Sequence, residues 1–456
     1  MSRQDPPDRL LLKNGRVIDP TADVDDLLDV LIENGAVARV ERGIAASSAD
    51  RVVECDSLVV APGFVDMHVH LREPGREDKE TIETGGLAAA AGGFTAVACM
   101  PNTVPVNDDQ SVTEFILAQA RRGSPVRVHP IGAITKGQKG EELSEIAELV
   151  RVGCVAISDD GRPVSNGFIM RKALEYAKMF DIPVINHAQD LALANGGVMN
   201  EGFYSTVLGL RGMNAAAEES MIHRDILLAE LTGGRLHIPH ISTARSLELV
   251  RRAKERGVRV TCEAAPHHFT LTDEAVCGYD TSTKMNPPLR AESDRDAVVQ
   301  ALFDGTIDAV ASDHAPHCQE EKDVEYDLAP FGIVGLETSV PLGLDRLVAE
   351  AGLDLKQFVR LYSSGPARIL GLAAGTLRPG SPADVTVFST SSETTVDPCA
   401  FRSKSRNTPF TGWTLKGAVV LTIVGGGIVF DPLGRGGSRQ APRRGGGRAG
   451  GNRISL

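Results

Sequence analysis

The stretch GFVDMHVHL, residues 63–71, has the composition of a buried β-strand, yet it carries two imidazole side chains. Side chains at positions i and i+2 of a strand point to the same face, so His68 and His70 should project side by side. Two histidines placed in this way suit two ligands of one metal ion, and they equally suit two hydrogen-bonded core histidines. The rest of the chain has to decide between these interpretations.

The strand pattern of residues 63–71 returns seven times along the middle of the chain, and helical patterns separate most of the copies. The helical stretches 81–93, 140–153, 166–180 and 244–257 carry apolar residues at three- and four-residue spacing. Eight strands in such alternation predict a (β/α)₈ barrel, and a doubly wound open sheet is the alternative. No GxGxxG follows the first strand, which disfavours a dinucleotide-binding fold. The eight predicted strands are 63–71, 94–102, 126–135, 154–161, 183–190, 235–243, 259–268 and 307–317.

Both ends of the chain have the sequence pattern of β-hairpins. LLLKNGRVID (residues 10–19) and DVLIENGAVARV (residues 29–40) each carry an Asn-Gly turn signal between apolar segments, and similar strand patterns return after residue 375. We therefore expect residues 1–61 and 375–432 to pair into one composite β-sandwich domain. The barrel, residues 62–374, would be inserted between the two halves.

The composition of the 456 residues is that of a soluble globular protein, with 42% hydrophobic and 24% charged residues. No apolar run reaches the length of a membrane span, and MSRQDPPDRL at the start lacks the apolar core of a signal peptide. Seven scattered cysteines without a CxxC pair favour a reduced environment. These features predict a cytoplasmic protein that does not enter a membrane.

The net charge of −12 is unevenly distributed, because residues 433–456 hold six arginines, eight glycines and no acid. Such a segment has no apolar periodicity, so we expect a disordered tail. It is either a solvated extension or a contact for RNA or an acidic partner. The acidic remainder of the chain disfavours a nucleic-acid-binding protein.

Histidine and aspartate residues recur at the carboxyl ends of the predicted strands. In a parallel barrel these ends surround one mouth, where barrel enzymes keep their active sites. Four imidazoles and two carboxylates suit zinc better than magnesium or calcium, and six donors allow two ions that share a bridging carboxylate. Such a site favours hydrolysis or closure of an amide bond. The residues are His68, His70, Asp160, His187, His240 and Asp313, with Asp159 beside them as a neighbour that would orient the loop or a ligand.

A set of motifs between residues 66 and 338 resembles the amidohydrolase superfamily and, within it, the dihydroorotase family often associated with aspartate carbamoyltransferase. Their order and spacing make the resemblance specific. The chain departs from the pattern at Ala188 and Gln189 and in its basic tail. The motifs are DMHVHLREPG (66–75), MPNT (100–103), SDDG (158–161), NHAQD (186–190), PHIST (239–243), APHHFTLTDE (265–274), KMNPPLR (284–290), SDHAPH (312–317) and APFGIVGLET (329–338).

The resemblance implies a role for each matching position. His68, His70 and Asp313 would contact a first zinc ion, His187 and His240 a second, and Asp160 would bridge two ions if two are bound. Asp313 would also be the catalytic acid/base, and Arg72 would grip a substrate carboxylate. The implied substrate-binding positions are His70, Arg72, Asn102, Asn286, His317, Phe331 and Gly332.

The implied reaction is the reversible cyclisation of N-carbamoyl-L-aspartate to L-dihydroorotate in pyrimidine biosynthesis, by metal-activated hydroxide and an aspartate acid/base. The implied partners are the small-molecule substrate, further copies of the chain and aspartate carbamoyltransferase. One alternative is a hydantoinase or allantoinase, which commonly bridges its metals with a carboxylated lysine. No lysine lies between Lys139 and Lys172, so Asp160 would have to serve. The other alternative is an inactive structural relative, which would typically have lost metal ligands.

Overall fold

The eight predicted barrel strands are all present in the computed structural model, which describes residues 9–435. They form a three-stranded parallel sheet, β6-β7-β8, and a five-stranded parallel sheet, β15-β14-β13-β10-β9. Within residues 9–435 only single bridges, Gly132 to Ile157 and Val69 to His314, join the two sheets, so the pairing around the barrel is not continuous. The strands are β6 Phe64–Val69, β7 Phe94–Cys99, β8 Arg127–Pro130, β9 Ile157–Ser158, β10 Pro183–Ile185, β13 Arg235–Ile238, β14 Val260–Ala264 and β15 Ala309–Val310.

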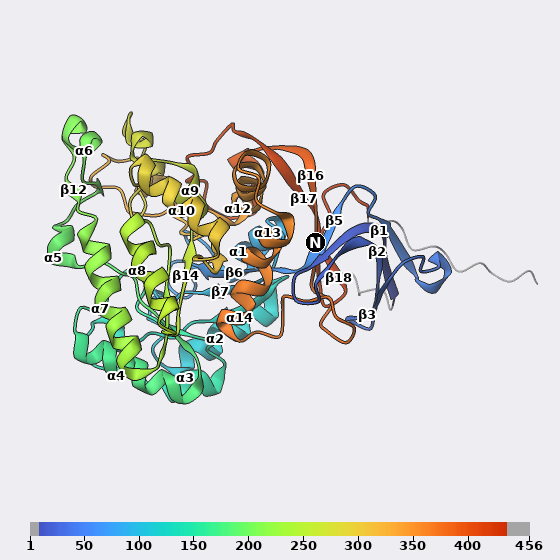
Figure 1. Cartoon of the computed structure of the whole chain (residues 1–456), viewed down its shortest axis with the longest axis horizontal. Coiled ribbons are helices and arrows are strands. Elements are labelled where there is room, and N and C mark those ends of the chain that lie inside the picture. The colour runs from blue at the N-terminus through green and yellow to red at the C-terminus, as the bar shows by residue number, and fades with distance from the viewer. Residues whose placement is uncertain (1–8, 436–456) are drawn as a thin grey trace, which may run out of the picture.

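Helices follow the barrel strands and cover their outer side (Figure 1). Several begin at a side-chain cap, as the sequence pattern requires: Asp109 accepts from Ser111 N at 2.7 Å, and Thr243 accepts from Ser246 N at 3.1 Å. The four helical stretches expected from the sequence all contain helices. The main covering helices are α1 Ile82–Ala91, α2 Gln110–Gly123, α3 Ile146–Val152, α4 Gly167–Ala177, α7 Ala216–Thr232, α8 Ala244–Glu255, α10 Glu292–Asp304, α12 Leu336–Leu342, α13 Leu355–Val359 and α14 Gly365–Leu370.

Strands from both chain ends hydrogen-bond into one eight-stranded sheet, in the order β18-β17-β16-β5-β1-β2-β3 with β4 also paired to β1. The expected composite β domain is therefore present, and in Figure 1 it lies at the opposite end of the molecule from α4 and α7. The domain boundaries drawn from the sequence stay predictions. The strands are β1 Arg9–Asp19, β2 Val24–Glu33, β3 Ala36–Glu41, β4 Arg51–Glu54, β5 Val59–Pro62, β16 Val385–Thr395, β17 Thr414–Val424 and β18 Gly427–Phe430.

The two Asn-Gly pairs of the amino-terminal region differ in structure. Asn34 and Gly35 both have positive φ, 52° and 78°, and form the predicted hairpin turn between β2 and β3. The prediction of a hairpin turn at Asn14-Gly15 is wrong, because strand β1 continues through both residues. Asn14 has φ 61°, and the register with β2 shifts between Leu12 and Gly15, so this pair forms a β-bulge.

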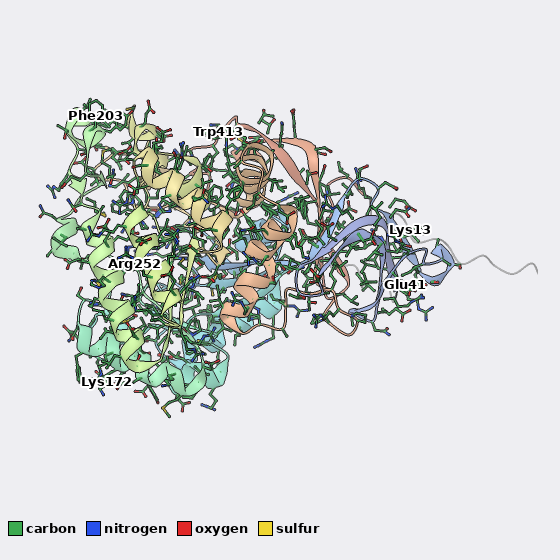
Figure 2. The ribbon with its side chains drawn as sticks, viewed as in Figure 1. Lys13, Glu41, Lys172, Phe203, Arg252 and Trp413 are labelled. Atoms are coloured by element: carbon green, nitrogen blue, oxygen red, sulfur yellow. The ribbon has the colours of Figure 1, made fainter. Side chains whose placement is uncertain are left out.

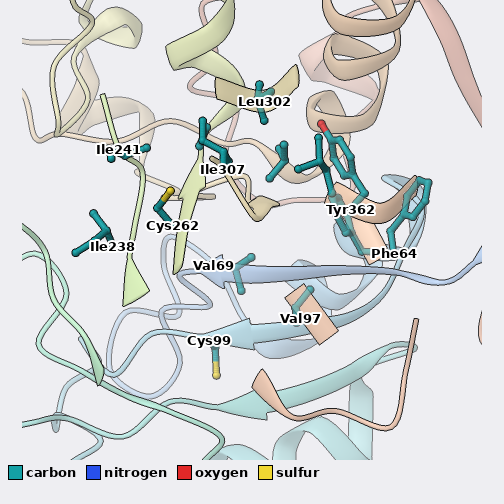
Figure 3. Close-up of a cluster of buried hydrophobic side chains, with 14 of the residues drawn as sticks. Phe64, Val69, Val97, Cys99, Ile238, Ile241, Cys262, Leu302, Ile307 and Tyr362 are labelled. Carbon is teal, nitrogen blue, oxygen red and sulfur yellow. The ribbon is translucent and has the colours of Figure 1, made fainter. Parts of the chain in front are cut away.

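An aromatic cluster joins the composite sheet to the barrel, and Figure 3 shows two of its members, Phe64 and Tyr362. The ring of Phe64 on β6 lies 5.6 Å from Tyr362 and 5.7 Å from Phe388 on β16, measured between centroids. Thr386 of β16 also accepts a hydrogen bond from Phe64 N at 3.1 Å. The strand that carries His68 and His70 is thus anchored at its start by buried aromatic contacts.

Between β10 and α7 the chain makes an excursion that the sequence patterns did not predict. It comprises α5 Leu191–Ala194, β11 Met199–Asn200, α6 Phe203–Leu208 and β12 Gly212–Met213. Phe203 at its tip lies far from Lys13 and Glu41 of the composite sheet (Figure 2). Within residues 9–435 no helix is long and apolar enough to span a bilayer. Apart from residues 433–435, the tail predicted to be disordered lies outside the described residues.

Candidate metal centre and active site

The six predicted ligands come together at the carboxyl ends of the barrel strands, and all six are buried. His68 lies in β6 and His70 follows it, while the other four come two or three residues after the ends of their strands. Parallel strands bring their carboxyl ends to one mouth, which explains how residues up to 245 positions apart converge. The four are Asp160 after β9, His187 after β10, His240 after β13 and Asp313 after β15.

A first group consists of His68, His70 and Asp160, whose candidate ligand atoms lie within 4.8 Å of one another. Each histidine Nε2 atom is 3.5 Å from one oxygen of Asp160. Asp313 adjoins this group, with Oδ1 at 3.3 Å from His70 Nε2 and 3.5 Å from His68 Nε2. Two imidazoles and two carboxylates therefore face one small volume.

A second group consists of Asp160, His187 and His240, again with ligand atoms within 4.8 Å of one another. Asp160 Oδ1 lies 3.7 Å from both His187 Nδ1 and His240 Nε2. Asp160 belongs to both groups, and its side chain is the one that could bridge two ions.

The residues fit a bound metal, because the cluster leaves polar atoms unsatisfied. Among the described residues, His68 Nε2 and Asp160 Oδ1 are buried without any hydrogen-bond partner. Burying such atoms unpaired is costly, and a cation between them would satisfy both. The mixed nitrogen and oxygen donor set is one that zinc accepts.

Neighbouring acceptors hold the Nδ1 protons of His68 and His70 away from the cluster. Asn102 Oδ1 accepts from His70 Nδ1 at 2.9 Å, and Glu263 Oε1 accepts from His68 Nδ1 at 2.8 Å. With Nδ1 donating, each ring presents its Nε2 atom to the cluster, and release of the Nε2 proton frees a lone pair for a metal ion. Gln189 Oε1 similarly lies 3.1 Å from His187 Nε2, which leaves His187 Nδ1 free to face the second group.

Glu263 is a functional candidate that the sequence analysis missed. It is buried on β14, and its second oxygen lies 3.1 Å from His237 Nε2. Burial by itself would raise the pKa of Glu263, but hydrogen bonds from His237 and His68 outweigh burial and lower it to about 2. The only signal in the sequence was an acid inside an apolar strand, in VTCEA.

The carboxylates of the cluster are held in their ionised form. Burial opposes ionisation of Asp160, yet the nearby His68 charge outweighs it and the pKa lies well below the usual value. Burial also favours the neutral form of Asp313. The hydrogen bond from His70 outweighs burial, so the pKa of Asp313 is lowered as well. Both groups can therefore bind a cation, and Asp313 can accept a proton.

Three of the site residues have backbone conformations that are unusual for residues other than glycine. Arg72, His240 and Asp313 have φ of 61°, 34° and 48°. Such conformations cost on the order of 1–3 kcal/mol each and persist where the surrounding structure enforces them, commonly at functional sites.

Two of the predicted substrate-binding residues, Arg72 and His317, lie together beside the cluster. Arg72 Nε donates to Pro316 O at 3.2 Å, and burial lowers the pKa of Arg72 to about 10, which leaves it charged near neutral pH. His317 Nε2 donates to Phe331 O at 2.9 Å. Burial, with Arg72 close by, lowers the pKa of His317 to about 3 and keeps this ring neutral.

Gly332 and Asn286 are two further predicted substrate-binding residues. Gly332 has φ 121°, and a Cβ there would lie 2.7 Å from Ala315 Cβ, so only glycine fits without displacement. Asn286 Nδ2 donates to Gln189 Oε1 at 2.8 Å and lies 3.1 Å from His187 Nε2. Asp159 points elsewhere: its carboxylate accepts from the backbone of Ile134 and Thr135, which is the loop-orienting position expected for it.

Two family models match this chain, and relatives that match nearly its whole length carry the name of one of these families. Residues 57–246 match the Dihydro-orotase-like family, and residues 333–430 match the Amidohydrolase family. A dihydroorotase of Geobacter metallireducens is 56% identical over 421 residues, which cover 92% of this chain and 99% of the relative. A dihydroorotase of Pelotomaculum thermopropionicum is also 56% identical, over 93% of this chain and 99% of the relative.

Solved structures share the fold across nearly the whole chain. L-hydantoinase (dihydropyrimidinase) from Arthrobacter aurescens superimposes with a TM-score of 0.85 at 26% identity, covering 95% of this chain and 97% of that one. Dihydropyrimidinase from Brevibacillus agri has a TM-score of 0.82 at 22% identity, and this likeness shows the fold alone. From the near-complete coverage by relatives at 56% identity, the chain belongs to the dihydroorotase family of the amidohydrolases.

Proposed function

We propose that the chain is a zinc-dependent dihydroorotase, which interconverts N-carbamoyl-L-aspartate and L-dihydroorotate in de novo pyrimidine biosynthesis. The observation that carries the proposal is the position of Asp160, shared by two buried groups of histidines within reach of one another. We propose that one or two zinc ions bind there, with His68, His70 and Asp313 at the first, His187 and His240 at the second, and Asp160 between them.

Zinc bound at this place would act as a Lewis acid that makes water nucleophilic near neutral pH and polarises an amide carbonyl. Asp313 lies beside the first group, ionised and 3.3 Å from His70 Nε2. In the hydrolytic direction its carboxylate takes a proton from water and delivers it to the leaving ring nitrogen. In the direction of ring closure the same carboxylate removes the proton from the attacking nitrogen and passes it to the departing hydroxide, which leaves as water.

The substrate carboxylate is assigned to Arg72, whose planar guanidinium can make two parallel hydrogen bonds to it. Asn102, Asn286 and His317, with the backbone near Phe331 and Gly332, would hold the remaining polar atoms of the substrate. His70 would contact the substrate as well as the first metal ion. Fixing the ring in this way converts binding energy into orientation of the scissile amide.

A hydantoinase activity is the second candidate, because L-hydantoinase shares the fold at a TM-score of 0.85. Two features of the chain favour the dihydroorotase reaction. Asp160 supplies the carboxylate where the alternative expects a lysine, and Arg72 lies half-buried beside Asp313 and Asp160, where a substrate carboxylate would bind. An inactive relative is disfavoured, because all six proposed ligands are present and adjacent.

The proposal includes a cytoplasmic enzyme that assembles with further copies of itself and with aspartate carbamoyltransferase, as the family resemblance implies. The testing experiment uses the purified chain alone, assayed in both directions with L-dihydroorotate and N-carbamoyl-L-aspartate alongside metal analysis and light scattering. Turnover with bound zinc supports the assignment. Zinc-loaded protein that turns over neither compound, even after aspartate carbamoyltransferase is added, contradicts it.

A further inference from the structure

His314 follows Asp313 directly but takes no part in the proposed reaction. It is buried, with 1% of its surface exposed, and its ring bonds to groups outside the metal cluster. Its Nδ1 accepts hydrogen bonds from the backbone of Gly335 at 3.1 Å and Leu336 at 3.5 Å. Because Nδ1 accepts, the ring proton lies on Nε2, which donates to Glu80 Oε2 at 3.3 Å.

Glu80 is itself fully buried and joins three segments of the chain. It lies near the end of the loop between β6 and α1, which contains Arg72, and it faces His314 in the segment that follows β15. Ser403 and Thr84 donate to it through their hydroxyl groups, and Lys404 N donates to Oε1 at 3.2 Å. Donors surround both oxygens, so the carboxylate is fixed in place.

The backbone on both sides of Asp313 is fixed as well. Ser312 N donates to the buried carboxylate of Asp66 at 3.1 Å, and His314 N donates to Ser312 Oγ at 3.1 Å. His314 O accepts from His70 N at 2.8 Å, which ties this segment to the strand of the first histidine pair. Between these anchors Asp313 adopts φ 48°, a left-handed conformation that costs free energy in a residue with a side chain and that the surrounding hydrogen bonds hold in place.

We propose that Glu80 and His314 are positioning residues that hold Asp313 in its left-handed conformation, with its carboxylate aimed at His68 and His70. The inference rests on the proposed role of Asp313 as acid/base. The pair acts through the ring of His314, which fixes the peptide unit after Asp313 and leaves the metal cluster untouched. It should therefore govern turnover far more than it governs substrate binding or metal content.

The test compares Glu80→Gln and His314→Gln with a matched control, Glu337→Gln. Glu337 Oε1 accepts from Arg402 N at 2.8 Å and Ser403 N at 3.2 Å, so it anchors the same segment as Glu80 through backbone groups. Among the described residues its carboxylate makes no bond to His314. Any loss caused by loosening residues 402–404 alone would appear equally in this control.

We expect Glu80→Gln and His314→Gln each to lower kcat for L-dihydroorotate by about tenfold or more, with KM and zinc per chain within about twofold of wild type. The control should stay within about twofold in all three quantities. Because the two residues act as one unit, the double variant should be no slower than the slower single variant. The thermal unfolding midpoint of every variant is measured in the zinc-loaded full chain.

Three outcomes would overturn the inference: equal kcat in Glu80→Gln and the control, a loss in kcat that only follows lost zinc or unfolding, or multiplicative losses in the double variant. Each of these presupposes that the wild type turns over L-dihydroorotate. A wild-type chain without that activity overturns the proposed function first, and the inference together with it. The wild-type assay thus separates the two failures.

Discussion

His187 Nδ1 lies 3.0 Å from His240 Nε2, deep in the barrel mouth, and both nitrogens also face Asp160 Oδ1 at 3.7 Å. Two imidazole nitrogens at this distance repel each other unless a proton or a metal ion lies between them. Gln189 Oε1 lies 3.1 Å from His187 Nε2, and the tautomer that donates to it leaves a lone pair on His187 Nδ1. The arrangement favours a metal ion shared with the carboxylate.

Metal removal should abolish activity, and zinc should restore it. We expect Asp160→Asn to weaken zinc binding in both groups, because its carboxylate belongs to both, whereas His240→Ala should weaken only the second. Zinc per chain after dialysis against a chelator, measured by elemental analysis, distinguishes these cases. Full activity in protein shown to be free of metal would rule out the mechanism.

Asp313→Asn should keep most of its zinc and lose nearly all turnover. Five other candidate ligands remain, but an amide cannot accept the proton that the leaving nitrogen needs. General acid–base catalysis typically contributes 10²–10⁴-fold, so we expect kcat to fall by about 10³-fold. Paired measurement of zinc content and of kcat across the pH range checks this. Substantial kcat at any pH would remove Asp313 from the acid/base role.

Arg72→Ala should lower kcat/KM for L-dihydroorotate by at least about a hundredfold, roughly 2.7 kcal/mol, through loss of a charge-assisted contact in a buried site. Arg72→Lys should recover only part of this, because an ammonium group cannot reproduce the planar fork. Zinc content should be unchanged in both variants. Near-wild-type kinetics for Arg72→Ala would show that the carboxylate binds elsewhere.

Deletion of residues 433–456 should leave kcat/KM for L-dihydroorotate within about twofold of the full chain. All proposed site residues lie between positions 68 and 332, and the tail sequence has no apolar periodicity. Steady-state kinetics and light scattering on the shortened chain provide the measurement. A tenfold loss would reveal a contact between the tail and the site or an assembly surface.

The barrel and its ligands were predictable because each depends on a short local pattern. The strand containing His68 shows its burial and its same-face histidines within nine residues, and the other ligands follow apolar runs in the same way. The two Asn-Gly pairs show where local patterns fail. Asn34-Gly35 closes a hairpin, whereas Asn14-Gly15 becomes a bulge, since pairing with β2 on one side continues past it.

The supporting contacts of the site were not predictable from one sequence. Glu263 meets His68 across 195 positions, and Glu80 meets His314 across 234, so neither pairing leaves a local periodic signal. These two contacts form only in the folded chain, where segments that are distant in the sequence lie side by side. Buried charged groups such as these indicate a role, but the sequence cannot say which partner satisfies them.

The most direct test of the account is the ratio of kcat/KM for L-dihydroorotate to that for unsubstituted hydantoin, measured with the zinc-loaded full chain. Dihydroorotate carries a carboxylate beside the scissile amide and hydantoin carries none, so the ratio reports on the proposed partner of Arg72. We expect a preference for dihydroorotate of at least about a hundredfold, which Arg72→Ala should largely remove. Equal or faster turnover of hydantoin by the wild type would contradict the account and identify a general cyclic amidohydrolase.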